Sequence, residues 1–169
     1  MNHHLNITRI KSVYHSLGEL KEKVVFVGGA TISLYVDTKT EEIRPTDDID
    51  IVVEIYTHQE YAVLDEQLRK LGFVNDQTTY VICRYTIQGL IVDVMPTQIE
   101  ALGFSNKWYQ PAFENAIHHS LGDENIKIFT PPYFLASKLE AFLQRGKNDG
   151  RTSTDFEDII FLLENRSTI

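Results

Sequence analysis

Three aspartates and two adjacent glycines, Gly28 and Gly29, carry the most chemical information in this chain. Asp48 and Asp50 open an apolar run, and Asp93 interrupts a second one. Because side chains alternate along a strand, Asp48 and Asp50 share one face, and their Cα atoms lie about 6.5 Å apart. With a third carboxylate from a neighbouring strand, they could hold a pair of Mg²⁺ ions about 3.5–4 Å apart. The pattern predicts metal-assisted phosphoryl transfer, in which Asp93 also orients or deprotonates the attacking hydroxyl.

A less specific interpretation of the acids is also open. Asp47, Asp48 and Asp50 could simply form the solvated start of a strand, and a lone Asp-x-Asp is a weak signal. Asp93 argues against this interpretation, because a carboxylate inside an apolar strand is costly unless a cation or a hydrogen-bond network compensates it. We expect Asp47 to point away from the metals, and we assign it no chemistry.

The glycines directly follow the apolar run 24–27 and precede the start of a predicted helix. Glycine lets the backbone approach a ligand closely, and a helix N-terminus favours anionic phosphates. Gly28 and Gly29 are therefore predicted to bind a triphosphate, with a hydroxyl from Thr31 or Ser33. The alternative is a tight turn without a ligand. The segment is not a Walker A loop, since no Gly-Lys-Ser/Thr follows.

A second charged set lies near the C-terminus. Lys138, Phe142 and Arg145 follow one stripe of a predicted helix, and Asp155 and Asp158 lie three residues apart on the next. In one interpretation the two cations contact triphosphate oxygens and the two acids orient them. In the other, the charges only complement the helix dipoles. The spacing alone favours neither.

The apolar patterns predict an α/β (α+β) fold, in which helices flank a mixed β-sheet and a helical part follows. We expect a single domain over residues 1–169, with a sheet-containing core to about 104 and a mainly helical part from about 105. A capping box of Thr154 and Glu157 is expected to start the last helix. The predicted helices are 5–23, 30–36, 58–71, 106–121, 131–145 and 154 onward, and the predicted strands are 24–27, 48–54, 80–87, 90–95 and 126–129, with a hairpin at Gln88-Gly89.

Composition limits the other possibilities. The formal net charge of −8 argues against tight, non-specific nucleic-acid binding, although a local basic patch stays compatible with it. The single cysteine, Cys83, excludes an internal disulfide, and we expect it to be a small buried residue. The sequence shows no signal peptide and no membrane span, which predicts a cytoplasmic protein. His118 and His119 are expected to be surface residues on the predicted 106–121 helix.

Taken together, these motifs resemble those of the polymerase-β-like nucleotidyltransferases. The later motifs resemble the AbiEii/AbiGii-type toxin branch, also called MenT-like. The resemblance covers roughly residues 24–163. It is carried by Gly28-Gly29-Ala30, Arg44-x-Thr46-x-Asp48-Ile49-Asp50, Asp93, Lys138-Leu139-x-Ala141-Phe142-x-x-Arg145-Gly146 and Asp155-x-x-Asp158-Ile159.

The resemblance implies a catalytic set, a metal set and a nucleotide set. The catalytic set is Asp48, Asp50, Asp93 and Lys138; the metal set is Asp48 and Asp50, joined by Asp93 from its strand context; the nucleotide set is Gly28, Gly29, Lys138, Arg145, Asp155 and Asp158, joined by Thr31 from the turn. The implied cofactor is Mg²⁺, with Mn²⁺ as a substitute. The implied activity is transfer of a nucleoside monophosphate from a nucleoside triphosphate to the tRNA acceptor end, by a toxin that a partner antitoxin counters.

Other functions stay open. The chain is short for the toxin branch and acidic, so a protein hydroxyl or a smaller acceptor is an alternative to RNA. A small-molecule, antibiotic-type nucleotidyltransferase would label such an acceptor and ignore RNA. A non-catalytic interaction protein with the same fold would bind nucleotide without turnover.

Overall fold

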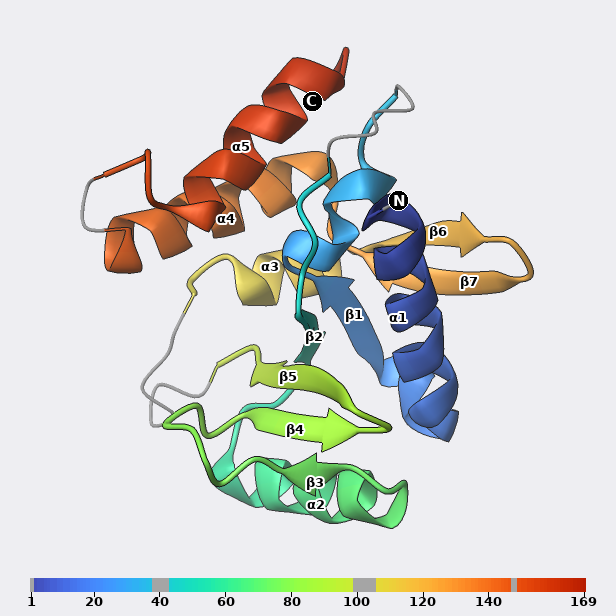
Figure 1. Ribbon diagram of the computed structural model, residues 1–169. Coiled ribbons are helices and arrows are strands. Elements are labelled where there is room, and N and C mark those ends of the chain that lie inside the picture. Colours follow the sequence, from blue (N-terminus) through green and yellow to red (C-terminus); the bar gives the residue numbers. More distant parts are fainter. Residues whose placement is uncertain (1, 38–42, 99–105, 147–148) are drawn as a thin grey trace.

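A seven-stranded mixed sheet with the strand order β3-β4-β5-β2-β1-β7-β6 lies at the centre of the molecule (Figure 1). The computed structural model describes residues 2–37, 43–98, 106–146 and 149–169. The pairs β2–β5 and β1–β7 are parallel, and the other neighbouring strands are antiparallel. The strands are β1 (Val24–Val27), β2 (Asp48–Val53), β3 (Val74–Asn75), β4 (Arg84–Ile87), β5 (Leu90–Pro96), β6 (Ile117–Leu121) and β7 (Glu124–Ile128).

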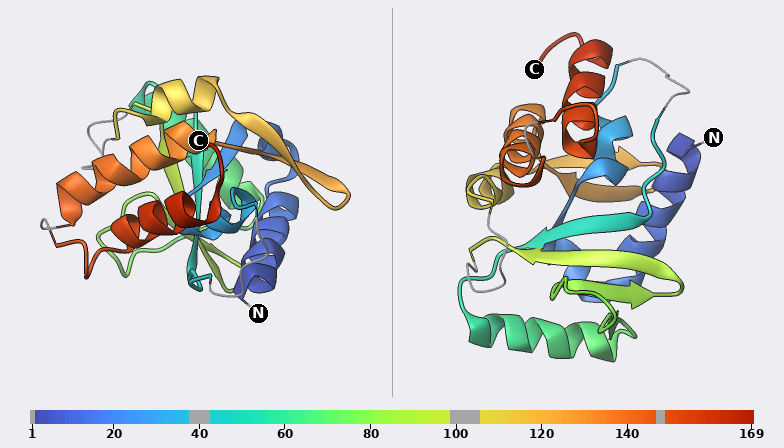
Figure 2. Two further views of the ribbon diagram at one scale, coloured as in Figure 1. Left: turned by 90° about the horizontal axis from the view of Figure 1, so that it is seen from above. Right: turned by 60° about the vertical axis from the view of Figure 1, so that its left-hand side comes forward.

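Helices cover the sheet, so the predicted mixed sheet flanked by helices is confirmed. Helix α1 lies on one side of the sheet, whereas α3 and α4 lie on the other (Figure 2). Helix α5 packs against α4. The helices are α1 (Asn2–Ser16), α2 (His58–Lys70), α3 (Tyr109–Glu114), α4 (Pro131–Arg145) and α5 (Thr154–Asn165), with two 3-10 helices, η1 (Gly18–Lys23) and η2 (Gly29–Leu34).

The two central strands, β1 and β2, differ in how many of their faces are buried. All four residues of β1 are buried, as expected for a continuous apolar run at the centre of a sheet. Strand β2 alternates at its start, with Ile49 and Ile51 in the core and Asp48 and Asp50 half-buried on the opposite face. The period of two thus presents both carboxylates on a face that the core does not occupy.

The predicted helix over 106–121 is wrong. Helix α3 ends at Glu114, and residues 117–121 form β6, which pairs with β7. Pro111 and its neighbours start a helix, but the pairing of Ile117 with Ile128 gives the following residues a strand conformation that local propensity does not reveal. His118 and His119 therefore lie on an edge strand, where the first is exposed and the second half-buried.

Several predicted element ends also shift. The strand predicted over 80–87 begins only at Arg84, and its partner β3 was not expected. The predicted 5–23 helix ends at Ser16, because Gly18 adopts a positive φ of +53° before η1. The segment after the glycine turn is a 3-10 helix. The cap of α5 is Ser153, whose hydroxyl accepts from the Phe156 amide, rather than Thr154.

The hairpin at Gln88-Gly89 is confirmed, and both residues have positive φ, as a two-residue turn between antiparallel strands requires. The predicted boundary near residues 104 and 105 lies outside the described residues. Among the described helices, none combines the length and the apolar character needed to cross a bilayer.

Candidate active site

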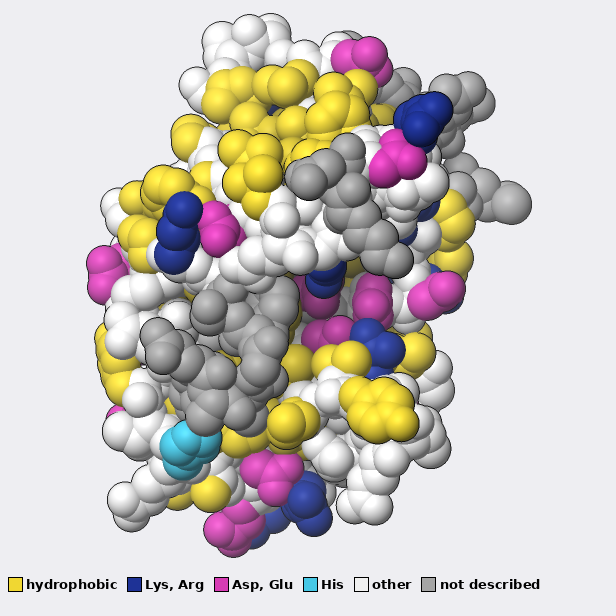
Figure 3. Space-filling view, turned by 90° about the vertical axis from the view of Figure 1, so that its left-hand side faces the viewer, with side chains coloured by type: hydrophobic (Ala, Val, Ile, Leu, Met, Phe, Trp, Pro, Cys, Tyr) yellow, Lys and Arg dark blue, Asp and Glu magenta, His cyan; other side chains and the backbone are white. Residues whose placement is uncertain are grey.

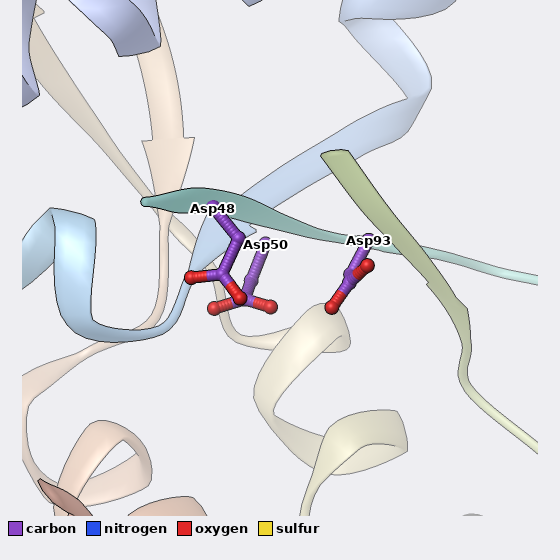
Figure 4. A group of neighbouring side chains, drawn as sticks. All are labelled: Asp48, Asp50 and Asp93. Carbon is purple, nitrogen blue, oxygen red and sulfur yellow. The ribbon is translucent and has the colours of Figure 1, made fainter. Parts of the chain in front are cut away.

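The three predicted aspartates come together on one face of the sheet (Figure 4). In the parallel β2–β5 pair, Asp50 lies directly beside Asp93, and Asp48 lies two residues before Asp50 on the same face. One carboxylate oxygen from each residue lies within 4.8 Å of the other two. Clustered carboxylate oxygens are the ligands that Mg²⁺ prefers, so these residues fit a divalent cation.

The charge of this cluster is reflected in the pKa of Asp50. Burial raises the pKa of its carboxyl to about 7, and the neighbouring carboxylates of Asp48 and Asp93 add to the shift. Lys138 opposes the shift. Close carboxylates that resist joint ionisation form a strong site for a cation, because a bound cation relieves their repulsion.

The glycine turn brings the backbone against these acids. Gly28 has φ +73°, and a Cβ at this position would lie 1.9 Å from Oδ2 of Asp50. A Cβ on Gly29 would lie 2.7 Å from Nη2 of Arg44. Only glycine allows the chain to pass this closely, which leaves the backbone of the turn open to the space in front of the three aspartates.

Thr31 and Ser33 do not join Gly28 and Gly29 in lining the cleft described below, so far as the described residues show. Both are buried, and the Thr31 hydroxyl donates to the Gly28 carbonyl oxygen at 2.9 Å. This bond closes the turn, which favours a structural role for Thr31. Its predicted contact with nucleotide stays a prediction.

The C-terminal charges form one ion network between α4 and α5. Lys138 Nζ lies 2.7 Å from Asp158 Oδ2 and 3.2 Å from Asp155 Oδ1. Arg145 makes two bonds to Asp155, from Nε at 2.8 Å and from Nη2 at 2.9 Å. Burial disfavours the charged form of Lys138, but the two aspartates outweigh it and hold the pKa of the ammonium above its usual value. The four charges therefore pair with one another and do more than complement helix dipoles.

Two arginines complete the site, and the sequence motifs alone predict no role for either of them. Arg84 donates from Nε to Asp93 Oδ1 at 2.8 Å and from Nη2 to Asp93 Oδ2 at 2.7 Å. Arg44 links the loop before β2 to α5, with Nη2 at 3.4 Å from Asp158 Oδ1. A signal for Arg84 was present, since counting outward from the Gln88-Gly89 turn pairs Arg84 with Asp93. No local pattern connects Arg44 to Asp158.

Apart from Asp158, which lies behind Lys138 and is not among the described lining residues, these charged groups line one cleft with a volume of about 520 Å³. Figure 3 shows the side of the molecule that lies on the left in Figure 1. Acidic and basic side chains meet there in a hollow near the middle. Cys83 is half-buried in the lining, where burial raises the pKa of its thiol to about 12 and keeps it protonated. The charged residues of the lining are Arg44, Asp48, Asp50, Arg84, Asp93, Lys138, Arg145 and Asp155.

This fold and this arrangement of residues agree with the nucleotidyltransferase class that the motifs predict. The family model described as "Nucleotidyl transferase AbiEii toxin, Type IV TA system" matches residues 12–169. The chain belongs to this AbiEii toxin family, which confirms the resemblance inferred from its motifs.

A solved structure supports the fold. The solution structure of the antibiotic-resistance factor ANT(2'')-Ia aligns with a TM-score of 0.61 and 13% sequence identity. The alignment covers 97% of this chain and 85% of that chain. Comparison with curated proteins gives no significant match. The structural neighbour supports the predicted nucleotidyltransferase fold, and the family model supports the enzyme class.

Proposed function

We propose that the protein transfers a nucleoside monophosphate from a nucleoside triphosphate to an acceptor hydroxyl, with a divalent cation held by Asp48, Asp50 and Asp93. The observation that carries this proposal is the convergence of three carboxylates directly in front of a glycine turn. Magnesium is the proposed ion, and Mn²⁺ is its substitute, because both accept carboxylate oxygens. When bound, the cation would neutralise the charge that develops on the phosphates.

The residues of the chain then have separate roles. The acceptor oxygen forms a bond to the α-phosphorus, the bond to the bridging α–β oxygen breaks, and pyrophosphate leaves. Asp93 orients the acceptor hydroxyl and accepts its proton. The backbone at Gly28 and Gly29 lies against the triphosphate, and Lys138, which lines the same cleft, neutralises its oxygens. Catalysis consists mainly of positioning and charge neutralisation.

Arg145 and the two acids of α5 act on the same phosphates in different ways. The side chain of Arg145 is 61% exposed, so its guanidinium can contact an entering triphosphate while keeping its bonds to Asp155. Asp155 and Asp158 are buried, and their proposed role is to orient the cationic side chains. Bidentate guanidinium donors suit phosphate oxygens, which supports this division of roles.

The proposed acceptor is an RNA hydroxyl, as the family resemblance implies, and the proposed setting is a cytoplasmic toxin countered by an antitoxin protein. A small-molecule acceptor is the second candidate. It is favoured by the fold shared with an antibiotic-resistance factor and by the net charge of −8, which opposes a polyanionic partner.

The test is incubation of the protein with each α-labelled nucleoside triphosphate, Mg²⁺ and total cellular RNA. We expect label in RNA, and we expect it to disappear in the Asp48→Asn/Asp50→Asn variant. The matched control is Asp47→Asn, which removes an exposed carboxylate from the same segment and should retain activity. Circular dichroism must show that all variants are folded.

The other outcomes of this experiment distinguish the alternative functions from one another. Label in a small molecule or in protein would keep the chemistry and overturn the RNA acceptor. Absence of label from folded protein, together with saturable thermal stabilisation by nucleotide, would identify a non-catalytic binding module instead.

A further inference from the structure

Arg84 belongs to the same row of the sheet as the metal ligands. Arg84 on β4 pairs with Asp93 on β5, and Asp93 pairs with Asp50 on β2. Directly opposed residues on neighbouring strands project from the same face, so this register places a guanidinium beside the carboxylates. Its position is fixed by the sheet and does not depend on a mobile loop.

The guanidinium bonds to three of the six carboxylate oxygens that a cation could use. It bonds to both oxygens of Asp93, and its Nη2 also lies 3.3 Å from Oδ2 of Asp48. The Arg84 side chain is only 21% exposed, and the Asp93 side chain 11%. Arg84 thus bridges two of the three proposed metal ligands from a largely desolvated position, where a charge-assisted, two-pronged bond is strong.

A guanidinium and a divalent cation on the same oxygens repel one another. A cation that binds Asp48, Asp50 and Asp93 must therefore weaken or replace the contacts of Arg84. The released guanidinium has an alternative partner, since Arg84 lines the same cleft as Gly28 and Lys138. A triphosphate in that cleft offers planar guanidinium groups a strong bidentate acceptor.

We propose that Arg84 is the counter-cation of the metal site: it neutralises Asp93 and Asp48 when nucleotide is absent, and it turns to the triphosphate when the cation binds. This inference rests on the proposed function, because it requires the three aspartates to be metal ligands. Its consequence is that cation and nucleotide bind cooperatively, since each removes the obstacle to the other. Arg84 is therefore a positioning residue that sets metal affinity.

The direct test is the affinity of the full chain for Mn²⁺ without nucleotide, measured by electron paramagnetic resonance of the free ion. We expect Arg84→Gln to bind Mn²⁺ at least about tenfold more tightly than the unmodified protein, because it removes the competing charge. Arg84→Lys keeps the charge but loses the fork geometry, so its affinity should lie between the two. The matched control, Arg44→Gln, removes a guanidinium of the same cleft that bonds to α5 instead, and should change Mn²⁺ affinity much less.

The second measurement is nucleotide affinity with EDTA and with saturating Mn²⁺, using the four α,β-methylene nucleoside triphosphates. The ratio of the two dissociation constants reports the coupling, and it should fall in Arg84→Gln. Cooperative thermal unfolding of each variant shows that it is folded. If Arg84→Gln does not fold, Arg84→Lys still provides the comparison with the unmodified protein.

The outcomes separate this inference from the proposed function. Equal Mn²⁺ affinity in the unmodified protein and in both Arg84 variants would overturn the counter-cation role and leave the metal site intact. Weaker Mn²⁺ binding in Arg84→Gln would overturn it as well, because the guanidinium would then support the site. Failure of every form to bind Mn²⁺, with no difference from Asp50→Asn, would overturn the metal site itself.

Discussion

At the scale of the residue, the site depends on how closely Gly28 approaches Asp50. The backbone at Gly28 has φ +73°, and the nearest carboxylate oxygen occupies the space that a Cβ would take. Two independent costs therefore fall on any side chain at this position, one from the conformation and one from the contact. The chain contains a control for the first cost, because Gly89 has φ +80° but no heavy atom within 4 Å of its Cβ position.

We predict that Gly28→Ala abolishes nucleotidyl transfer and destabilises the protein more than Gly89→Ala does. Gly89→Ala bears only the conformational cost of about 1–2 kcal/mol, and it should keep full activity. Gly28→Ala must also displace the Asp50 carboxylate, which disrupts the proposed metal site. Urea unfolding and transfer assays of both variants test this. Equal stability and equal activity of the two variants would contradict it.

The raised pKa of Asp50 predicts how the stability of the protein changes with pH in EDTA. A carboxyl with a pKa of about 7 when folded, against its usual 3.8 when unfolded, binds more protons in the folded state between those values. The contribution of Asp50 is therefore fully present below about pH 4 and is lost as the pH rises through 7. The free energy of unfolding should fall less steeply over this range in Asp50→Asn.

Denaturant titrations at intervals from pH 4 to 8 supply the measurement. The difference between Asp50→Asn and the unmodified protein removes the effect of other titrating groups. Parallel pH profiles for the two proteins would mean that Asp50 titrates normally, and the repulsion among the three carboxylates would then be smaller than the geometry indicates.

At the scale of the element, helices α4 and α5 are joined by the pairing of their charges. Lys138 is buried between Asp155 and Asp158, whereas Arg145 reaches Asp155 from the exposed end of α4. Two cations that share one buried acid can thus differ in their effect on stability. The reason is that a buried charge left without its partner is costly, but an exposed one is hydrated.

We predict that Lys138→Met destabilises the protein by about 3–5 kcal/mol, because it leaves Asp155 and Asp158 buried with less compensation. Arg145→Gln should cost less than Lys138→Met, because only Asp155 loses contacts and Lys138 still pairs with both Asp155 and Asp158. Both variants should lower transfer, and Arg145→Gln should do so with the fold intact. Urea unfolding combined with kcat and KM measurements tests the distinction. A larger stability loss in Arg145→Gln would contradict it.

At the scale of the whole molecule, the sequence predicts what depends on local pattern. Alternation in β2 identifies Asp48 and Asp50 as neighbours on one face, and the Gln88-Gly89 turn identifies the β4–β5 hairpin. The sequence does not predict features that depend on contacts between residues far apart in the chain. Residues 117–121 become a strand only because β7 lies beside them, and the contact between Arg44 and Asp158 joins positions that no local period relates.

The order of the elements along the chain predicts an order of activation during synthesis. Strands β2 and β5, which bring the aspartates together, precede α4 and α5, which carry the ion network. We expect ribosome-bound chains stalled before α5 has emerged to show no nucleotidyl transfer, while chains released after α5 do. Label incorporation by a set of stalled lengths provides the measurement. Activity in a chain that lacks the emerged α5 would contradict this.

The position of α5 after the other described elements also has a consequence for the cell that makes the protein. A domain generally folds as a unit, so a growing chain that still lacks α5 is not expected to hold the three carboxylates and the ion network in their final places. With the proposed activity, the protein would gain its chemistry only after α5 has left the ribosome. The ribosome that synthesises the protein would not be exposed to that activity before then.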